Sequence, residues 1–203
     1  MKIIAIGLNY TDHAKEFNGQ VQSEPMVFMK PDTALLRNNK PFFLPDFSNE
    51  IHHEIEVIVK IDRLGKNISE KFAPRYYSQI GIGIDFTARD LQHIQRARGN
   101  PWEICKSFDG SAVVSGFYPI EEFGDLRNLN FHLDIDGKTV QKGNTKDMIF
   151  DINQIIAYIS RFFTLKIGDI IFTGTPVGVG KVERNNRLQA YIENKLLLDF
   201  KVK

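Results

Sequence analysis

The sequence predicts an α+β fold in which β-strands predominate and helices are few. Seven segments have strand-like patterns, and only two have clear helical spacing together with a start signal. The composition, 42% hydrophobic and 25% charged residues with a net charge of +1, is that of a soluble globular protein and not of a disordered one. The 203 residues fit one large domain better than two, so we expect residues 1–203 to form a single domain.

Short apolar runs and apolar alternation, both typical of strands, recur along the chain. The predicted strands cover residues 2–7, 55–61, 80–86, 129–136, 169–173, 188–192 and 196–202. Asp136-Gly137 lies between two strand-like stretches, and both residue types tolerate positive φ. This pair therefore predicts a tight hairpin turn.

A first helix is predicted over residues 88–98. Thr87 and Asp90, three residues apart, form a pattern like a capping box, and Gly99 provides a stop. A short helical turn near Thr11 is also expected.

A second helix is predicted to begin after Asp151, which can cap it. Its apolar residues fall at helical spacing and predict a stripe that faces the core. The stripe comprises Ile152, Ile155, Ile156, Ile159 and Phe163.

Charge and hydropathy exclude several classes of function. A net charge of +1 lacks the basic footprint of a nucleic-acid binder, so we expect no nucleic-acid partner. No apolar run reaches the roughly 18 residues that cross a bilayer, so we expect no membrane partner. The single cysteine, Cys105, cannot form an internal disulfide and suits a reducing compartment, which predicts a cytoplasmic location and a structural thiol.

Two carboxylates lie two residues apart at the start of the strand predicted over 55–61. Side chains at this spacing share one face, so Glu54 and Glu56 project together while Ile55 and Val57 take the other face. Like charges at this distance repel unless a cation lies between them. A bound metal ion is one explanation, and a solvated face paired with Lys or Arg is the other. This fragment supports the two equally.

Asp85 favours the metal ion. It lies at the end of an apolar strand, directly before the predicted first helix. Together with Glu54 and Glu56 it offers an all-oxygen ligand set, which suits hard cations such as Mg²⁺ or Mn²⁺ better than zinc. We therefore expect these three residues to be metal ligands and His52 and His53 to be structural.

Six short blocks form an ordered pattern over almost the whole chain. They are Gly7-Leu8-Asn9-Tyr10 with Asp12-His13-Ala14 and Glu16; Ser23-Glu24-Pro25 with Phe28-Met29-Lys30-Pro31; His52-His53-Glu54-Ile55-Glu56; Asp85-Phe86-Thr87-Ala88-Arg89-Asp90 with Gln92; Pro101-Trp102 with Lys106-Ser107-Phe108; and Gly168-Asp169-Ile170-Ile171-Phe172-Thr173-Gly174-Thr175-Pro176 with Gly178-Val179-Gly180. In this order they resemble the fumarylacetoacetate hydrolase family, and within it the short acylpyruvate hydrolases and oxaloacetate decarboxylases.

The resemblance implies mixed β-sheets that form a roll with few helices, in a homodimer. It implies one Mg²⁺ or Mn²⁺ ion, held by the residues named above as ligands, and a small 2-oxo acid as substrate. The implied substrate-binding residues are Arg89, Gln92, Lys106 and Thr175.

The implied catalytic residues are Lys106 and a dyad of His13 and Glu16, the dyad on a mobile lid over residues 12–30. Lys30 and Asp109 receive no role. Phe86, residues 93–100 and the pair Asp109-Gly110 show no pattern that predicts substrate choice.

The implied chemistry is the formation of a pyruvate enolate. Lewis acidity would stabilise the enolate when the C3–C4 bond breaks, Lys106 would add positive charge, and His13 oriented by Glu16 would activate water. This favours a divalent-metal-dependent hydrolase of acylpyruvates, with decarboxylation of oxaloacetate as a further activity of the same site.

Two alternatives stay open. An isomerase or tautomerase of oxaloacetate-like or unsaturated 2-oxo diacids would need proton transfer at C3 but no attacking water. A non-catalytic metal-binding protein of the same fold is the other.

Overall fold

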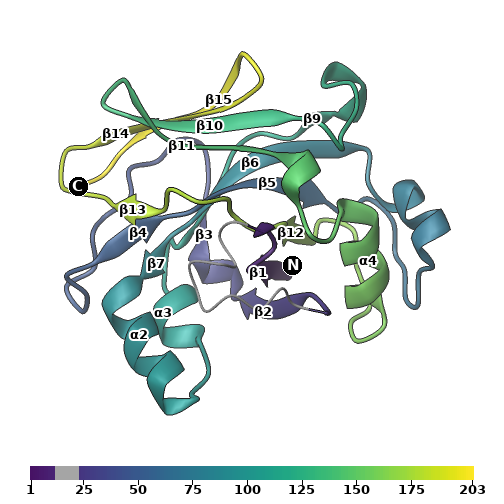
Figure 1. Cartoon of the computed structure of the whole chain (residues 1–203), viewed down its shortest axis with the longest axis horizontal. Coiled ribbons are helices and arrows are strands. Elements are labelled where there is room, and N and C mark those ends of the chain that lie inside the picture. The colour runs from purple at the N-terminus through teal and green to yellow at the C-terminus, as the bar shows by residue number, and fades with distance from the viewer. Residues whose placement is uncertain (12–22) are drawn as a thin grey trace.

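The computed structural model describes residues 1–11 and 23–203, and within them β-strands predominate (Figure 1). The largest sheet has the strand order β2-β1-β12-β5-β6-β8-β3, with β9 paired to β6. It is mixed, because β1 pairs with β12 and β3 with β8 in parallel while the other neighbours are antiparallel. Its strands are β1 (Ile3–Gly7), β2 (Met26–Lys30), β3 (Leu35–Leu36), β5 (Ile55–Lys60), β6 (Gln79–Asp85), β8 (Ala112–Val114), β9 (Tyr118–Pro119) and β12 (Ile170–Phe172).

Two smaller sheets complete the β-structure. An antiparallel sheet in the order β11-β10-β14-β15 contains β10 (Asn130–Ile135), β11 (Lys138–Asn144), β14 (Arg187–Ile192) and β15 (Lys195–Lys201). A second sheet in the order β13-β4-β7 contains β4 (Ile51–His53), β7 (Thr87–Ala88) and β13 (Gly180–Lys181). The predicted α+β fold with predominant β-structure is confirmed.

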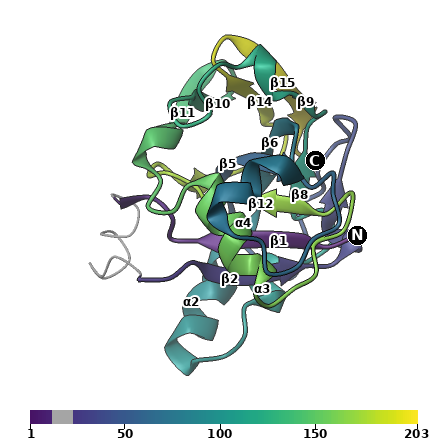
Figure 2. The ribbon, with the colours of Figure 1, turned by 90° about the vertical axis from the view of Figure 1, so that its right-hand side faces the viewer.

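The helices in the described residues are short. They are α2 (Arg89–Arg98), α3 (Glu103–Lys106) and α4 (Ile152–Ser160), with 3-10 turns η1 (Asp32–Ala34), η2 (Glu70–Tyr76), η3 (Ile120–Glu122) and η4 (Thr145–Asp147). In both views α2 and α3 lie on the opposite side of the molecule from the sheet that contains β10 and β14 (Figures 1 and 2). None of these helices has the length and apolarity needed to cross a membrane.

The main core lies between the largest sheet and the sheet of β10, β11, β14 and β15. Val57 and Ile82 of the large sheet belong to the same buried cluster as Leu133 of β10. Ile58 and Phe172 face the other way and belong to a second buried cluster. Central strands of the large sheet are thus buried on both faces, which explains the nearly continuous apolar run along β5.

All seven predicted strands exist, and each of their bounds lies within one residue of the expected one. The Asp136-Gly137 turn joins β10 to β11, and its two residues have φ values of +51° and +79°. The hairpin prediction is therefore confirmed. Short strands such as β4, β7 and β13 were not predicted, because two or three residues show no periodicity.

The first helix begins within one residue of its predicted start, but its predicted cap is wrong. Thr87 is buried in β7, and the helix α2 begins at Arg89 after Ala88, which makes no side-chain cap. Asp90 instead accepts hydrogen bonds from the Ser48 hydroxyl and the Asn49 backbone N–H. A contact with a distant loop therefore occupies the carboxylate that the local pattern assigned to capping. The stop is confirmed, since Gly99 has a φ of +66°.

The start of the second helix is confirmed. The Asp151 side chain accepts from the Gln154 N–H at 2.9 Å, and the Gln154 side chain accepts from the Asp151 N–H at 2.9 Å, which forms a capping box. The four isoleucines of the predicted stripe are buried, whereas Phe163 lies beyond the end of the helix.

The predicted lid is wrong at its carboxy-terminal end. Met26–Lys30 forms β2, which pairs with β1 from Gly7↔Met26 to Ile3↔Lys30. A strand held along its whole length in a sheet cannot open as a lid. Residues 12–22 of that segment, together with most of the turn expected near Thr11, lie outside the described residues.

Glycine in β6 permits close packing beside the face that carries Asp85. A Cβ atom at Gly83 would lie 2.6 Å from a ring carbon of Phe172 and 2.9 Å from Cγ2 of Ile58. Both of these neighbours are fully buried, so neither can move without disturbing the sheet.

We therefore expect Gly83→Ala to lower the free energy of unfolding by about 1–3 kcal/mol, the usual penalty for overpacking a core. Urea denaturation followed by circular dichroism measures the change. Gly116→Ala is the matched control, because its Cβ would meet Tyr118 atoms at 3.5 Å, an ordinary contact distance. If both variants unfolded at the same urea concentration, the close-packing explanation would be wrong.

Candidate active site

Three buried carboxylates converge where β5 and β6 lie side by side. Glu54 directly precedes β5, Glu56 lies within it, and Asp85 is the last residue of β6. The Asp85 backbone N–H donates to the Glu54 carbonyl at 2.8 Å, which fixes the two strands in register. One oxygen from each carboxylate lies within 4.8 Å of those from the other two. The three side chains therefore lie together, and their role as metal ligands stays a prediction.

Three cationic side chains surround this cluster. Lys106 Nζ lies 2.6 Å from Glu54 Oε2 and 2.7 Å from Asp85 Oδ2, so it bridges the two carboxylates. Arg89 Nη2 lies 2.6 Å from Glu54 Oε1, and Lys30 Nζ lies 2.6 Å from Asp85 Oδ1. Such buried charges are tolerated only when they are paired at close range.

The two lysines respond differently to the cluster. Burial lowers the pKa of Lys106, but Asp85 and Glu54 raise it by more, so its pKa lies above the ordinary value and the ammonium stays charged. For Lys30 burial prevails over the attraction of Asp85, and its pKa is lowered. Lys30 also donates to Ser111 Oγ at 3.0 Å and to the Lys106 carbonyl. Lys30 thus holds both the Asp85 carboxylate and the backbone of Lys106.

Glu56 has no ion pair with a Lys or Arg among the described residues. Its Oε2 accepts the Gly174 N–H at 2.7 Å. Burial raises its pKa well above the ordinary value, and the charges of Asp85 and Glu54 raise it further. Such a carboxylate requires either a proton or another cation.

Asp85 also retains an oxygen that is poorly satisfied. Although Lys30 Nζ lies 2.6 Å from Asp85 Oδ1, this oxygen accepts no hydrogen bond of good geometry from the described residues. Buried acceptors are normally paired. The unsatisfied Oδ1 of Asp85, the raised pKa of Glu56 and the all-oxygen donor set fit a hard divalent cation.

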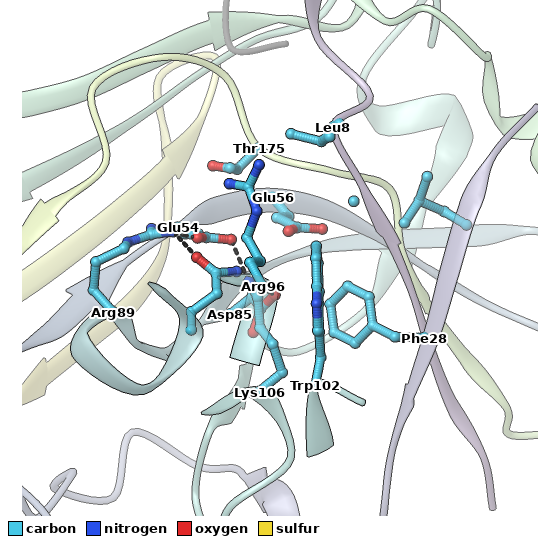
Figure 3. A pocket seen from close by; sticks show the side chains of 13 residues that line it. Leu8, Phe28, Glu54, Glu56, Asp85, Arg89, Arg96, Trp102, Lys106 and Thr175 are labelled. Carbon is cyan, nitrogen blue, oxygen red and sulfur yellow. Dashed lines mark hydrogen bonds and ion pairs between the residues drawn. The ribbon is translucent and has the colours of Figure 1, made fainter. Parts of the chain in front are cut away.

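The carboxylates line a pocket (Figure 3). Its polar lining consists of Glu54, Glu56, Asp85, Arg89, Gln92, Arg96, Lys106 and Thr175, and its other lining residues are Ile6, Gly7, Leu8, Phe28 and Trp102. A polar end beside an apolar wall is the usual character of a site for a small molecule. All predicted substrate-binding residues therefore lie on one pocket, which leaves their contacts with a substrate as a prediction.

Arg89, Gln92 and Thr175 are already engaged within the protein. Arg89 Nη1 donates to Gln92 Oε1, so these two side chains form one unit on α2. The Thr175 hydroxyl donates to the Ile55 carbonyl at 2.8 Å and accepts from Gln141 Nε2 at 2.7 Å. Because its proton is committed to that carbonyl, the hydroxyl is not a ready donor to a substrate.

Gln141 organises the strands behind the site. Its Oε1 accepts from the Ile55 N–H at 3.0 Å and lies 3.0 Å from His53 Nδ1, while its Nε2 also donates to the Pro176 carbonyl at 2.9 Å. The Gln141 oxygen is an acceptor, so His53 Nδ1 carries the proton. Burial lowers the pKa of His53 to about 4, which keeps the ring neutral. The structural role predicted for His53 is consistent with these contacts.

A buried asparagine anchors the pocket wall. Asn9 Nδ2 donates to the carbonyls of Phe150 and Thr173 at 2.9 and 2.7 Å, and Asn9 Oδ1 accepts the Phe150 N–H at 2.8 Å. Leu8, which lines the pocket, has a φ of +56°, a conformation that is rare for a branched residue. Gly174 has a φ of +102°, and a Cβ there would lie 2.6 Å from Asn9 Cβ. The turn at residues 8–9 is thus held by side-chain contacts.

Several site residues were not predicted from the sequence. Lys30 and Gln141 act through partners far away in the chain, and Arg96 falls in a stretch with no recognised pattern. Trp102 and Phe28 lie within the resembling blocks but received no role. The sequence signal that could have identified Arg96 is its spacing of seven residues from Arg89, which places the two on the same face of α2.

The predicted dyad and the cysteine have different outcomes. His13 and Glu16 lie outside the described residues, so their catalytic role stays a prediction. Cys105 is buried, its Sγ donates to the Trp102 carbonyl at 3.1 Å, and burial raises its pKa to about 11. A thiol with this pKa is not a nucleophile at neutral pH, in agreement with the structural role expected for it.

Comparisons with known proteins agree with this site. Residues 2–197 match the family described as Fumarylacetoacetate (FAA) hydrolase C-terminal. The chain is 41% identical over 200 residues to the mitochondrial oxaloacetate tautomerase FAHD1 of Bos taurus, covering 98% of this chain and 90% of that protein. It is 43% identical over 183 residues to the mitochondrial oxaloacetate decarboxylase of Dictyostelium discoideum, covering 90% and 84%.

A solved structure is similar over the whole chain. The fumarylpyruvate hydrolase from Pseudomonas aeruginosa, solved in complex with Mn²⁺ and pyruvate, superposes with a TM-score of 0.93 at 34% identity and covers 100% of this chain and 89% of that one. The family match extends over nearly every described element, including the strands that hold the three carboxylates. The chain belongs to the fumarylacetoacetate hydrolase family.

Proposed function

We propose that this enzyme interconverts the keto and enol forms of oxaloacetate or a closely related 2-oxo diacid, with the help of a divalent metal ion. The observation that supports this most directly is the buried triad of Glu54, Glu56 and Asp85 with the Lys106 ammonium beside it. The tautomerase activity named for the bovine relative supports the choice of reaction.

Glu54, Glu56 and Asp85 would hold a Mg²⁺ or Mn²⁺ ion, which when bound supplies Lewis acidity to the 2-oxo acid. Mn²⁺ is present in the fumarylpyruvate hydrolase of similar fold. Both ions accept oxygen ligands of this kind. Arg89, which pairs with Glu54 at 2.6 Å, orients that carboxylate.

Lys106 would stabilise the negative charge that develops on the enolate oxygen. Its ammonium is buried and held between Glu54 and Asp85, so little reorganisation is needed when charge appears beside it. Preorganised charge in a site that excludes water is worth much more than the same charge in solvent. The aromatic ring of Phe28, whose centroid lies 5.3 Å from Lys106 Nζ, limits the access of water.

His13 would move the proton at C3, with Glu16 orienting its ring. An imidazole suits this task because its pKa lies near neutrality. Arg89 and Gln92 would bind the carboxylate end of the substrate. Thr175 would bind the same carboxylate by donating its hydroxyl proton to it in place of the Ile55 carbonyl.

Cleavage of acylpyruvates is a second candidate function, with decarboxylation of oxaloacetate beside it. The sequence pattern alone favoured hydrolysis, with the tautomerase as an alternative. The fumarylpyruvate hydrolase neighbour and the Dictyostelium decarboxylase support these reactions. All three reactions pass through an enolate, so they require the same positive charge at the same place. A non-catalytic protein of this fold is no longer a candidate, because the chain is an enzyme of this family.

Further parts of the proposal concern assembly and location. We propose a homodimer in which residues 1–203 act as a single catalytic domain, with no nucleic-acid partner. The cytoplasmic location expected from the single cysteine stays a prediction, because the names of the bovine and Dictyostelium relatives place those proteins in mitochondria.

The metal site is tested with Glu56→Gln and Asp85→Asn. Each change removes an anionic ligand, so we expect the affinity for Mn²⁺ to fall at least tenfold and turnover to be lost. The metal-free Glu56→Gln protein should be at least as thermally stable as wild type, because the variant removes a carboxyl group whose ionisation is opposed by burial and by the charges of Asp85 and Glu54. Calorimetric titration and the rise in Tm on adding Mn²⁺ measure both effects.

Glu103→Gln provides the matched control, since Glu103 is an exposed carboxylate at the start of α3. It should bind Mn²⁺ like wild type. Unchanged Mn²⁺ affinity in both site variants would contradict the metal site.

The role of His13 is tested by comparing reactions. His13→Ala should lower tautomerisation of oxaloacetate and hydrolysis of an acylpyruvate by about a hundredfold or more, the usual contribution of a general base. Decarboxylation should fall much less, because it needs no base at C3. The rates are followed by loss of enol absorbance and by product analysis.

Lys106→Met is the companion variant and should lower all three reactions, since each passes through the enolate. If His13→Ala left tautomerisation and hydrolysis unchanged, the proton-transfer role would be refuted. If His13→Ala lowered the rates of tautomerisation, hydrolysis and decarboxylation equally, His13 would instead have a structural role in the site and not a role in proton transfer.

A further inference from the structure

One face of α2 presents three polar side chains to the pocket. Arg89, Gln92 and Arg96 stand at positions i, i+3 and i+7 of this helix, and all three line the cavity. Side chains at these offsets lie one above another on a helix. The helix therefore runs along the pocket, with Arg89 near the carboxylates and Arg96 two turns further on.

The two arginines differ in depth. Arg89 is buried and is paired with Glu54 at 2.6 Å. Arg96 is half-buried. In Figure 3 its long side chain extends across the pocket. A ligand that places its 2-oxo acid end against the buried carboxylates would therefore extend toward Arg96 with its other end.

The charges of the pocket favour a dianionic ligand. Among the described lining residues the three carboxylates are balanced by Arg89, Arg96 and Lys106. A bound divalent cation would leave an excess of two positive charges. A 2-oxo diacid lowers this positive excess by two charges, whereas a 2-oxo acid with a neutral tail lowers it by one. Lys30, which pairs with Asp85 behind the pocket, increases the positive charge around the pocket further.

Among the described residues, the wall beside Arg96 is mainly apolar. Leu8, Phe28 and Trp102 line the pocket with apolar atoms, and the rings of Phe28 and Trp102 pack with centroids 6.0 Å apart. These groups contact a carbon skeleton but offer nothing to a distal carboxylate except the Trp102 indole N–H. A guanidinium is the side chain best suited to a carboxylate, because it can donate two parallel hydrogen bonds.

We propose that Arg96 binds the distal carboxylate of the substrate and so makes the enzyme selective for 2-oxo diacids over 2-oxo acids with a neutral tail. This inference rests on the proposed function, which supplies the 2-oxo acid end of the ligand. It assigns Arg96 to specificity and leaves the chemical step to the residues described above.

A matched pair of substrates tests the assignment. Oxaloacetate and its 4-ethyl ester both enolise at C3 and differ in the charge of the distal group. Arg96→Gln should lower kcat/KM for oxaloacetate tenfold to a hundredfold, the range for a lost charged hydrogen bond, and should change the ester less than threefold. Arg96→Lys should recover part of the loss, because it restores the charge without the paired donors.

Arg98→Gln is the matched control, because Arg98 is an exposed arginine at the end of the same helix. Its kinetics should equal those of wild type with both substrates. Equal losses on oxaloacetate and the ester in Arg96→Gln, or no loss on either, would overturn the assignment.

Binding without turnover separates this inference from the proposed function. In the presence of Mn²⁺, 2-oxoglutarate and 2-oxopentanoate present the same 2-oxo acid end and differ in the distal carboxylate. Calorimetry should show that wild type prefers the diacid and that Arg96→Gln loses this preference. That result would support the role of Arg96 even if wild type turned over no substrate, which would refute the proposed function alone. No preference in wild type, or an undiminished one in Arg96→Gln, would overturn the inference.

Discussion

The buried cluster of charges at the junction of β5 and β6 is the constraint on which the rest of the site depends. Moving an ionised group out of water costs several kcal/mol even after the protein relaxes. Glu54 and Asp85 avoid most of this cost because Lys106 touches both at 2.6–2.7 Å. Close pairing of this kind is possible only if the surrounding backbone is rigid. The fold therefore provides a rigid frame that fixes the backbone positions of these charged residues.

That frame is built from packing and from backbone hydrogen bonds. The register of β5 and β6 places the Glu54 carbonyl against the Asp85 N–H. Glycine at position 83 lets Phe172 pack closely on the same face. Such rigidity has a functional use, since charges that are already in place stabilise a developing enolate without reorganising. Glu56, the carboxylate with the raised pKa, leaves the cluster suited to one more cation.

Much of this arrangement followed from local patterns in the sequence. Alternation along residues 54–57 correctly placed Glu54 and Glu56 on one face, because side chains in a strand point to opposite sides in turn. The turn at Asp136-Gly137 followed from the tolerance of both residues for positive φ. The family resemblance added Arg89 and Lys106, and both lie on the pocket. Their contacts with a substrate, like the roles of the dyad outside the described residues, remain predictions.

The partners of these residues were decided by the tertiary structure alone. Lys30 lies 55 positions before Asp85 and meets it only because β2 joins the sheet beside β1, where a lid had been expected. Asp90 accepts from Ser48 and Asn49 of a distant loop as well as from the Leu91 N–H of its own helix, because that loop passes close to it. The sequence by itself determined which face each side chain takes, since the period of a strand or helix is a local property. Which groups then meet across the sheet depended on strand order and register, which no local pattern encodes.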